Sequence, residues 1–255
     1  MASRASLSVV VPTLNERARL AALLESLRTE GAPEEVLVVD GGSRDGTPEL
    51  ALEQGARVLR AACGRGIQLA RGAAQATGDL FLFLHADTRV AGGALPVLRA
   101  AFEDPRLAAA GLRQRIDHPR RIYRWIERAA NARVKRGWVY GDSGLCVRRA
   151  DYEAVGGFRE LPLFEDLDLT RRLRVGREIR LLEQSELIVS ARRWEREGPV
   201  RATARNWALT LAWLAGVAPA RLVGYYRVEP PSAPGGYERE ADRDPQGLSG
   251  LPPEA

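Results

Sequence analysis

Apolar and amphipathic stretches alternate along the first hundred residues of the chain. Apolar runs at residues 7–11, 35–39 and 80–84, and a shorter segment at 57–60, have the length and composition of strands, and the LFLFL run is typical of a strand buried on both faces. Between them, apolar residues recur at helical spacing. Strands and helices alternating at these lengths predict right-handed parallel crossovers, and hence an α/β fold with a doubly wound, mostly parallel sheet.

The alternation breaks after a helix expected at residues 94–102. Beyond it the pattern predicts strands at 108–114, 141–149, 179–182 and 187–189, and helices at 118–136, 165–175, 200–217 and 219–226. From residue 229 onward proline, glycine and charge dominate, and too few apolar residues remain to offset the cost of ordering the chain. We therefore expect an α/β domain over 1–198, C-terminal helices packed on it over 199–228, and a disordered tail over 229–255.

Polar side chains follow two of the predicted strands at the point where each strand ends. Asp40 follows the second strand and opens a glycine-rich loop, and Asp87 follows the fourth. In open α/β sheets the ligand crevice lies outside the carboxyl ends of the strands. We therefore expect Asp40, Gly42 and Asp45 to border a pocket for a base, ribose or phosphate, and Asp87 to be a metal or phosphate ligand. The simpler alternative is that Asp87 only turns the chain.

A phosphate-binding element is predicted where Gly64 and Gly66 begin a helix. Glycines there let the backbone approach a diphosphate at the helix N-terminus, and Arg65 and Arg71 add positive charge. The segment lacks the third glycine of a dinucleotide fingerprint, and the chain contains no Gly-Lys-Ser/Thr sequence. Both of those familiar nucleotide-binding classes are therefore excluded.

The densest acidic cluster, formed by Glu165, Asp166 and Asp168, opens a predicted helix. One interpretation is a solvated helix start, where the helix dipole favours carboxylates. The other is a general base, because Phe158 and the apolar segment 161–164 surround the acids, and an apolar environment raises the pKa of a carboxyl group. The cluster by itself leaves both interpretations open.

Composition narrows the ligand class only in part. The 255 residues carry a net charge of +5, almost wholly from arginine, since Lys135 is the only lysine. Arginine keeps its charge and binds phosphate through two N–H groups at once, so the excess suits phosphorylated ligands, anionic lipid or nucleic acid. A GC-rich or thermophilic genome would produce the same excess. The charge alone therefore names no partner.

The sequence shows no sign of export, a disulfide framework or a membrane span. Cys63 and Cys146 match no metal spacing, the N-terminal apolar stretch is too short for a signal peptide, and no run reaches the roughly 20 apolar residues of a membrane span. We expect a soluble, cytoplasmic protein. The tryptophan-rich helix at 200–217 either lies on the cytoplasmic face of a membrane, or packs on the sheet or on a second subunit in a homodimer.

Five motifs occur together in the order and spacing of one enzyme family. They are Val11-Pro12-Thr13-Leu14-Asn15-Glu16, Val39-Asp40-Gly41-Gly42-Ser43-Arg44-Asp45-Gly46-Thr47, Phe83-Leu84-His85-Ala86-Asp87, Gly156-Gly157-Phe158 and Glu165-Asp166-Leu167-Asp168-Leu169. Over about residues 7–195 the chain resembles the family 2 glycosyltransferases, which have the GT-A fold. The resemblance implies a metal-dependent, inverting transfer of a sugar from a nucleoside diphosphate, usually UDP, to a small-molecule or lipid-linked hydroxyl acceptor.

The resemblance also implies roles for individual residues. Asp166 would be the general base, and Asp87 would bind Mn²⁺ or Mg²⁺ at the diphosphate. The nucleotide would be bound by Pro12, Leu14, Asn15, Glu16, Asp40, Gly42, Asp45, Arg65, Gly66, Arg71, His85 and Ala86. The donor sugar and the acceptor would meet Glu165, Gly144, Arg193 and Trp194.

The sequence departs from the family pattern at two places. His85 replaces the first aspartate of the Asp-x-Asp metal motif, which implies weaker metal binding centred on Asp87 and on substrate oxygens. Arg193-Trp194 retains only the end of the Gln-x-x-Arg-Trp motif of processive members, so we do not expect polymer synthesis. The short chain is also similar to small stand-alone members labelled as associated with radical-SAM and selenium-domain proteins, or with arsenosugar biosynthesis.

Two other functions fit parts of the pattern. A sugar nucleotidylyltransferase shares the alternating sheet, but the N-terminal loop lacks the glycine-rich phosphate grip with Arg and Lys that such enzymes need. A non-enzymatic binder of RNA or anionic membrane would use the arginine surface. The preferred hypothesis, a glycosyltransferase, expects no nucleic-acid partner and leaves the donor sugar and the acceptor unnamed.

Overall fold

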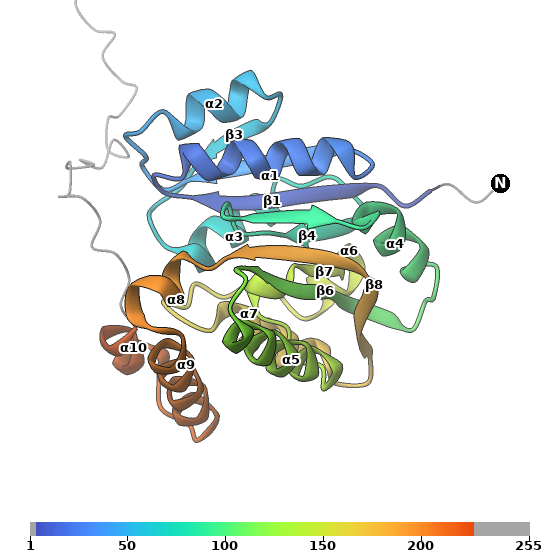
Figure 1. Ribbon diagram of the computed structural model, residues 1–255. Helices are drawn as coiled ribbons and strands as arrows, with labels where there is room; N and C mark the ends of the chain where they lie inside the picture. The colour runs from blue at the N-terminus through green and yellow to red at the C-terminus, as the bar shows by residue number, and fades with distance from the viewer. Residues whose placement is uncertain (1–3, 227–255) are drawn as a thin grey trace, which may run out of the picture.

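Eight strands form one sheet at the centre of residues 4–226, the part of the chain that this computed structural model describes. In chain order the strands are β1 (Leu7–Thr13), β2 (Glu35–Asp40), β3 (Arg57–Arg60), β4 (Leu80–Phe83), β5 (Thr88–Ala91), β6 (Leu107–Asp117), β7 (Leu145–Arg148) and β8 (Glu178–Ser190). Across the sheet their order is β3-β2-β1-β4-β7-β6-β8-β5. Figure 1 shows β1 and β4 near the middle of the molecule and β8 beyond them. The strands β3, β2, β1 and β4 run parallel to one another, and β6 and β8 are also parallel. The mostly parallel α/β sheet is therefore confirmed. The predicted tail over 229–255 lies outside the described residues.

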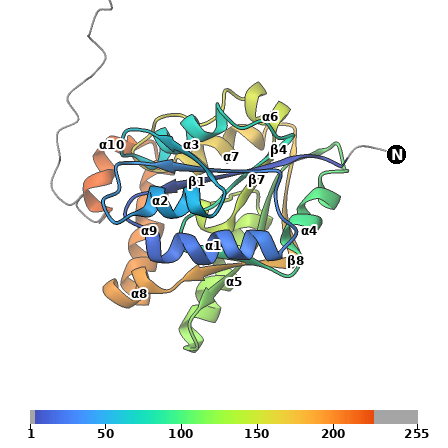
Figure 2. The same cartoon turned by 90° about the horizontal axis from the view of Figure 1, so that it is seen from above.

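Helices cover both faces of the sheet. They are α1 (Arg17–Thr29), α2 (Thr47–Glu53), α3 (Arg65–Ala73), α4 (Ala94–Ala101), α5 (Arg121–Lys135), α6 (Arg149–Ala154), α7 (Glu165–Leu173), α8 (Arg192–Glu197), α9 (Pro199–Leu214) and α10 (Pro219–Leu222), with 3₁₀ turns η1 (Gly141–Ser143) and η2 (Val223–Tyr225). Seen from above, α1 lies on one side of the sheet and α3 and α6 lie on the other (Figure 2). The protein therefore has three layers, with the sheet in the middle.

The strand β4 is buried on both faces, as its apolar sequence predicts. Leu80 and Leu82 belong to the hydrophobic cluster on the α1 side, and Phe81 and Phe83 belong to the cluster on the α3 side. The ring of Phe83 packs edge-on against Phe158, with 4.7 Å between centroids. Full burial of each such side chain contributes about 1.5–3 kcal/mol, so the carboxyl end of β4 is held firmly where the predicted site begins.

The second half of the chain differs most from its sequence pattern. The strands expected at 179–182 and 187–189 form one strand, β8, because its pairing with β6 shifts register between Leu112 and Arg113 and the bulge takes up the polar residues 183–185. The short edge strand β5 and the helix α8 were not predicted. The first strand also continues through Pro12 to Thr13 rather than ending before the proline.

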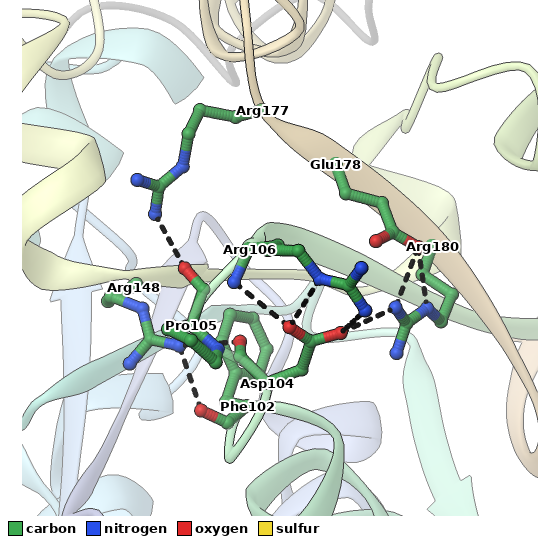
Figure 3. Close-up of polar contacts among 8 residues, drawn as sticks. All are labelled: Phe102, Asp104, Pro105, Arg106, Arg148, Arg177, Glu178 and Arg180. Carbon is green, nitrogen blue, oxygen red and sulfur yellow. Dashed lines mark hydrogen bonds and ion pairs between the residues drawn. The ribbon is translucent and has the colours of Figure 1, made fainter.

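Ion pairs fix the loop between α4 and β6 at the opposite end of the sheet from the strand ends Asp40 and Phe83. The Asp104 carboxylate accepts hydrogen bonds from the backbone N and Nε of Arg106, at 3.0 and 3.1 Å, and from Arg180 at 3.1 Å (Figure 3). These hydrogen bonds, those from Arg106 first, hold the pKa of Asp104 below its usual range. The partners are near the surface, so we treat the cluster as a local clamp on the loop rather than as a site.

The last helices pack on the region that follows α6. Trp213 of α9 is buried against Phe164, with 5.5 Å between ring centroids, whereas Trp207 and Leu211 on the opposite side of α9 are exposed. Within residues 4–226, none of the helices combines the length and the apolar character needed to cross a bilayer. The helix expected at 200–217 is thus attached to the domain by one face, and membrane contact or a homodimer through the other face stays a prediction.

Candidate active site

The loops that follow β1 and β2 are hydrogen-bonded to each other. The backbone N–H of Asn15 donates to Ser43 Oγ at 2.9 Å, the N–H of Arg44 donates to Asn15 Oδ1 at 2.9 Å, and the N–H of Glu16 donates to Thr47 Oγ1 at 3.0 Å. Asn15 has a φ of 55°, a left-handed conformation that asparagine tolerates better than most residues. The two motifs predicted to border the nucleotide pocket therefore form one continuous edge.

Asp40 holds the second of these loops in shape. The residue is 3% exposed, and its carboxylate accepts hydrogen bonds from the N–H groups of Gly42 and Ser43 at 2.9 Å each and from Thr13 Oγ1 at 3.3 Å. Asp45 acts similarly on the next turn, accepting from the N–H of Thr47 and of Arg17 at 3.0 Å each. Partial burial would raise the pKa of Asp45, but the hydrogen bond from the Thr47 hydroxyl group, followed by those from the two N–H groups, outweighs it and lowers the pKa.

Gln68 joins the ends of β1 and β2 and was not predicted as a site residue. Its buried side-chain amide donates to the carbonyl oxygens of Thr13 at 2.9 Å and Val39 at 2.7 Å. The only sequence signal was a polar residue between Ile67 and Leu69, on a helix whose inner face is otherwise apolar.

A cleft at the carboxyl end of the sheet brings together residues that are distant in sequence. It has a volume of about 150 Å³ and lies between the end of β4, the turn η1, the start of α7 and the C-terminal helices. Six predicted site residues line it: Arg65, His85, Asp87, Asp166, Arg193 and Trp194. The remaining walls include Asn206, Thr210 and Tyr226, which no sequence motif indicated.

Asp166 extends into this cleft from the first turn of α7. Its carboxylate accepts hydrogen bonds from the backbone N–H of Gly141 and of Leu167, both at 2.7 Å. Burial, and after it the neighbouring carboxylate of Glu165, raise the pKa of Asp166 to about 6. The side chain is therefore ionised at neutral pH but basic enough to accept a proton from a bound hydroxyl group.

The two acids beside Asp166 are neutralised by arginines. Glu165 forms an ion pair with Arg65, and Asp168 forms one with Arg172 at 2.7 Å. Glu165, Asp166 and Asp168 are 1%, 7% and 8% exposed, so the interpretation of a solvated helix start is wrong. Phe164 precedes the helix with a φ of 66°, a conformation that is strained for a bulky residue and that is typical of functional sites.

His85 and Asp87 lie just beyond β4, in the same cleft. His85 Nε2 lies so close to Gly141 that a Cβ atom there would collide with the ring, which explains the glycine. Burial, and then the charge of Arg65, lower the pKa of His85, so the imidazole is neutral at pH 7. The side chain of Asp87 is 27% exposed, and its nearest cation is Arg192 at 3.9 Å.

These residues can hold a divalent cation only together with a ligand. No group of three or more carboxylate, histidine or cysteine side chains within residues 4–226 is arranged to bind a metal ion. Asp87 supplies an accessible carboxylate, and neutral His85 supplies a nitrogen ligand. Mn²⁺ and Mg²⁺ are commonly bound by one or two protein carboxylates plus phosphate oxygens, so the donor set fits a cation shared with a diphosphate.

Arg192 connects the cleft to the first loop. Its guanidinium lies 3.1 Å from Glu16 and 3.9 Å from Asp87, so one cation spans the nucleotide edge and the predicted metal ligand. Sequence reasoning gave Arg192 no role, since it stands only as the neighbour of Arg193-Trp194. Arg193 in turn hydrogen-bonds to Asn206 at 3.2 Å, which ties α8 to α9.

Other predicted positions support the cleft without lining it. A Cβ atom on Gly66 would lie 2.9 Å from the carbonyl oxygen of Leu161, so the glycine permits α3 to pack on that loop. Gly144 has a φ of 63° and turns the chain into β7. Arg71 is exposed, and α3 carries it about 9 Å along the helix axis from Arg65, so it is not brought to the cleft. Pro12, Leu14 and Ala86 lie at or just after the ends of β1 and β4.

Comparison with known proteins assigns the family. The sequence model of the family described as Glycosyl transferase family 2 matches residues 8–156. A 4,4'-diaponeurosporenoate glycosyltransferase of Staphylococcus haemolyticus is 33% identical over 93 residues, which are 33% of this chain and 25% of that protein. Glucosyl-3-phosphoglycerate synthase of Mycobacterium tuberculosis is 33% identical over 93 residues, which are 32% of this chain and 29% of that protein. The chain thus spans less than a third of the length of either relative.

Solved structures support the fold. A mannosyltransferase, PcManGT, from Pyrobaculum calidifontis in complex with GDP-Man and Mn²⁺ superimposes with a TM-score of 0.61 at 19% identity, covering 88% of this chain and 70% of the other. The glucosyl-3-phosphoglycerate synthase of Mycobacterium tuberculosis in complex with Mn²⁺, UDP and phosphoglyceric acid superimposes with a TM-score of 0.59 at 20% identity, covering 84% and 79%. The family model matches more than half of this chain, and the GT-A fold is confirmed. The chain therefore belongs to glycosyl transferase family 2.

Proposed function

We propose that the protein transfers a sugar from a nucleoside diphosphate, with UDP as the expected nucleotide, to a hydroxyl acceptor, with inversion at the anomeric carbon. The observation that carries the proposal is Asp166, a buried carboxylate with a pKa raised to about 6 in the same cleft as Asp87, His85 and Arg65. A base on one side and groups that stabilise a leaving diphosphate on the other are the two requirements of this reaction.

In the proposed reaction Asp166 accepts the proton of the acceptor hydroxyl group. The hydroxyl oxygen attacks the anomeric carbon from the face opposite the diphosphate, so that one C–O bond forms while the C–O bond to the diphosphate breaks. The hydrogen bonds from Gly141 and Leu167 keep the carboxylate in one orientation for this transfer. Arg65 forms an ion pair with Glu165, whereas Asp166 forms no ion pair within residues 4–226.

Negative charge that develops on the departing diphosphate is stabilised by Arg65 and Arg193, which line the cleft. Asp87 and His85 are the residues that would hold Mn²⁺ or Mg²⁺, and such a cation neutralises the same charge when it is bound. This assignment is supported by the structures described above, which contain Mn²⁺ with GDP-Man in one case and with UDP in the other. The base preference is part of the proposal, since those two nucleotides differ.

For the acceptor and the subgroup, the proposal names a class and no single compound. The names of the relatives imply different acceptors, a phosphoglycerate in one and a diaponeurosporenoate in the other. The proposed resemblance to the transferases labelled as radical-SAM and selenium-domain associated, or as arsenosugar biosynthesis enzymes, is supported by the incomplete processive motif at Arg193-Trp194.

Nucleotide binding and turnover test the proposal. Thermal shift with UDP and GDP, each with and without Mn²⁺, should show a metal-dependent rise in melting temperature, and a panel of nucleotide sugars should then reveal the donor by release of nucleoside diphosphate. Asp166→Asn should lose turnover and still bind the nucleotide. Glu153→Gln, which changes an exposed carboxylate of α6, is its matched control. The absence of any nucleotide-dependent shift contradicts the proposal. Pyrophosphate release from UTP and a sugar phosphate would indicate a nucleotidylyltransferase, and salt-sensitive RNA retention without turnover would indicate a non-enzymatic binder.

A further inference from the structure

A second cavity lies directly beside the cleft, between α5 and α9. Its volume is about 260 Å³, near the lower end of the range for small-molecule pockets, which begins at about 300 Å³. Tyr140, Asp142, Trp194, Asn206 and Thr210 line both the cleft and this cavity. These five residues form the border between the two, so a molecule bound in the cavity, which we call the α5/α9 groove, lies next to the cleft that holds Asp166.

The lining of the α5/α9 groove is mainly apolar. Ile126, Ala129, Trp138, Trp207, Leu211 and Leu214 contribute to it. Leu211 and Trp207 are 63% and 57% exposed, so the rim presents large apolar side chains to solvent, which costs free energy unless something covers them. An apolar surface next to a transfer site suits the apolar part of a substrate.

A buried polar side chain also lines the α5/α9 groove. Gln114 of β6 is 2% exposed, and neither its amide oxygen nor its amide nitrogen has a hydrogen-bond partner within residues 4–226. Its backbone is already satisfied by Asn131, which leaves the side chain as a free donor and acceptor. A buried amide without partners is unfavourable by itself and becomes favourable when a ligand supplies a matching hydroxyl or carbonyl group.

Gln114, rather than the charge of the α5/α9 groove, determines which polar group is recognised there. Two arginines of α5 and its C-terminus line the groove: Arg133 pairs with Asp142 at 3.2 Å and lies over the ring of Tyr140, 3.4 Å from its centroid, and Arg136 hydrogen-bonds to the carbonyl oxygen of Ala132 at 3.3 Å. The groove thus combines arginine charge on one side with an uncharged polar side chain from β6. Gln114 is itself uncharged, so the group that it recognises needs hydrogen-bonding capacity rather than charge.

We propose that the α5/α9 groove is the acceptor site, and that it selects an amphipathic acceptor. The attacking hydroxyl group enters the cleft near Asp166, the apolar body lies along the groove against Trp207 and Leu211, and a second hydroxyl or carbonyl group hydrogen-bonds to the Gln114 amide. This inference rests on the proposed glycosyl transfer for its chemistry. The binding of an apolar, hydroxylated molecule in the groove does not depend on it.

Quenching of tryptophan fluorescence tests the proposal on the full chain. Bromine quenches tryptophan on contact, and three tryptophans, Trp138, Trp194 and Trp207, line the groove. We expect 8-bromooctan-1-ol to quench saturably and to bind about 3- to 10-fold more tightly than 1-bromooctane. Gln114→Leu should remove that preference and leave 1-bromooctane binding at wild-type strength.

A variant pair on one helix separates the groove from non-specific binding. Ala129→Phe places a ring in the groove and should weaken 8-bromooctan-1-ol binding at least 10-fold. Ala132→Phe, on the same helix but outside the groove lining, should not change it. Thermal melting of both variants checks that they fold. Unsaturable quenching, or equal effects of the two variants, overturns the proposal. Loss of quenching by competition with phosphatidylglycerol vesicles also overturns it, because the rim would then bind a lipid surface.

The two proposals fail in different ways. If UDP with Mn²⁺ stabilises the protein but no quenching occurs, the groove assignment is wrong and the glycosyl transfer stands. If quenching occurs but no nucleotide binds, the acceptor role is wrong together with the proposed function. With a donor identified, octan-1-ol should raise nucleoside diphosphate release above the rate in water, and glycerol, which lacks an apolar body, should not; equal effects of both alcohols overturn the selectivity.

Discussion

Glu165 and Asp166 are adjacent in sequence and both are buried, but within residues 4–226 only Glu165 forms an ion pair with an arginine. Arg65 neutralises Glu165, while Asp166 receives two backbone N–H groups and keeps its charge unpaired. The same burial therefore yields two different carboxylates. Glu165 anchors Arg65 at the cleft, and Asp166 is left with the raised pKa that a general base requires.

Replacing Asp166 by asparagine should remove the base and leave the nucleotide site intact. We expect turnover by Asp166→Asn to fall 10²- to 10⁴-fold, the usual contribution of a positioned base, with little change in the affinity for UDP. For the wild type, kcat/KM should rise with pH and level off above about pH 6, because only the ionised form accepts the proton. Steady-state kinetics across pH, with Glu153→Gln as the control, measure both; turnover by Asp166→Asn equal to that of the control would contradict the assignment.

The raised pKa of Asp166 also predicts how stability depends on pH. The carboxyl group has a pKa of about 6 in the folded protein and an ordinary value of 3.8, so its ionisation opposes folding. Below pH 3.8 the group is protonated in both states and costs nothing; the cost grows as the pH rises to 6 and is constant above it. Two pKa units correspond to about 3 kcal/mol. Between pH 4 and pH 8, the wild type should lose about this much unfolding free energy relative to Asp166→Asn.

Denaturant unfolding of both proteins at several pH values gives this difference directly. The asparagine variant loses one of the two carboxylate acceptors, which shifts its stability by a constant amount at all pH values. Only the change of the difference with pH therefore reports on Asp166. A difference that stays flat from pH 4 to pH 8 would show that the pKa is not raised.

The sequence predicted the N-terminal half of the site because its residues lie at the ends of locally defined elements. Asp40 and Asp87 each follow a strand whose apolar run is unambiguous, and parallel strands bring their carboxyl ends to one edge. The other wall has no such local signal. Asn206 and Tyr226 reach the cleft only because α9 and the segment after it pack back on α7, a long-range arrangement that no motif encodes.

The lack of a local signal also explains why Gln114 was not predicted as a site residue. Residues 108–114 indicated a strand, but one polar residue on its buried side cannot be distinguished by pattern from an ordinary surface position. The bulge at residues 183–185 of β8, opposite Leu112 and Arg113 of β6, joins two expected strands into one, and the sequence could not predict it because register is set by both partners. Local pattern thus predicted elements and their ends, and tertiary packing decided which polar residues became part of the site.

Removing Asp87 should separate metal-dependent from metal-independent nucleotide binding. Asp87 supplies the accessible carboxylate of the predicted metal position, and His85 is a neutral ligand that cannot replace its charge. We expect Asp87→Asn to lower the affinity for UDP about 10-fold or more in the presence of Mn²⁺, and to leave the weaker affinity in EDTA unchanged. Calorimetric titrations with Mn²⁺ and with EDTA measure the two affinities. An equal loss under both conditions would mean that Asp87 acts without a metal.

Asp40 provides a test of whether the nucleotide edge depends on a carboxylate. One of its oxygens accepts the N–H groups of both Gly42 and Ser43, and the other accepts the hydroxyl groups of Thr13 and Ser43, so an asparagine side chain would keep the first pair of bonds without the charge and would have to donate its NH₂ group to the hydroxyls. We expect Asp40→Asn to lower the unfolding free energy by about 1–3 kcal/mol, because hydrogen bonds to a charged acceptor are stronger than those to a neutral amide. Asp117→Asn, which changes a side chain that is 63% exposed, is the control and should change the unfolding free energy by less than about 0.5 kcal/mol.

Because the loop shaped by Asp40 is hydrogen-bonded to the Asn15 loop, Asp40→Asn should also weaken UDP binding. A stable variant with unchanged UDP affinity would show that neither the loop nor the nucleotide requires the charge at this position.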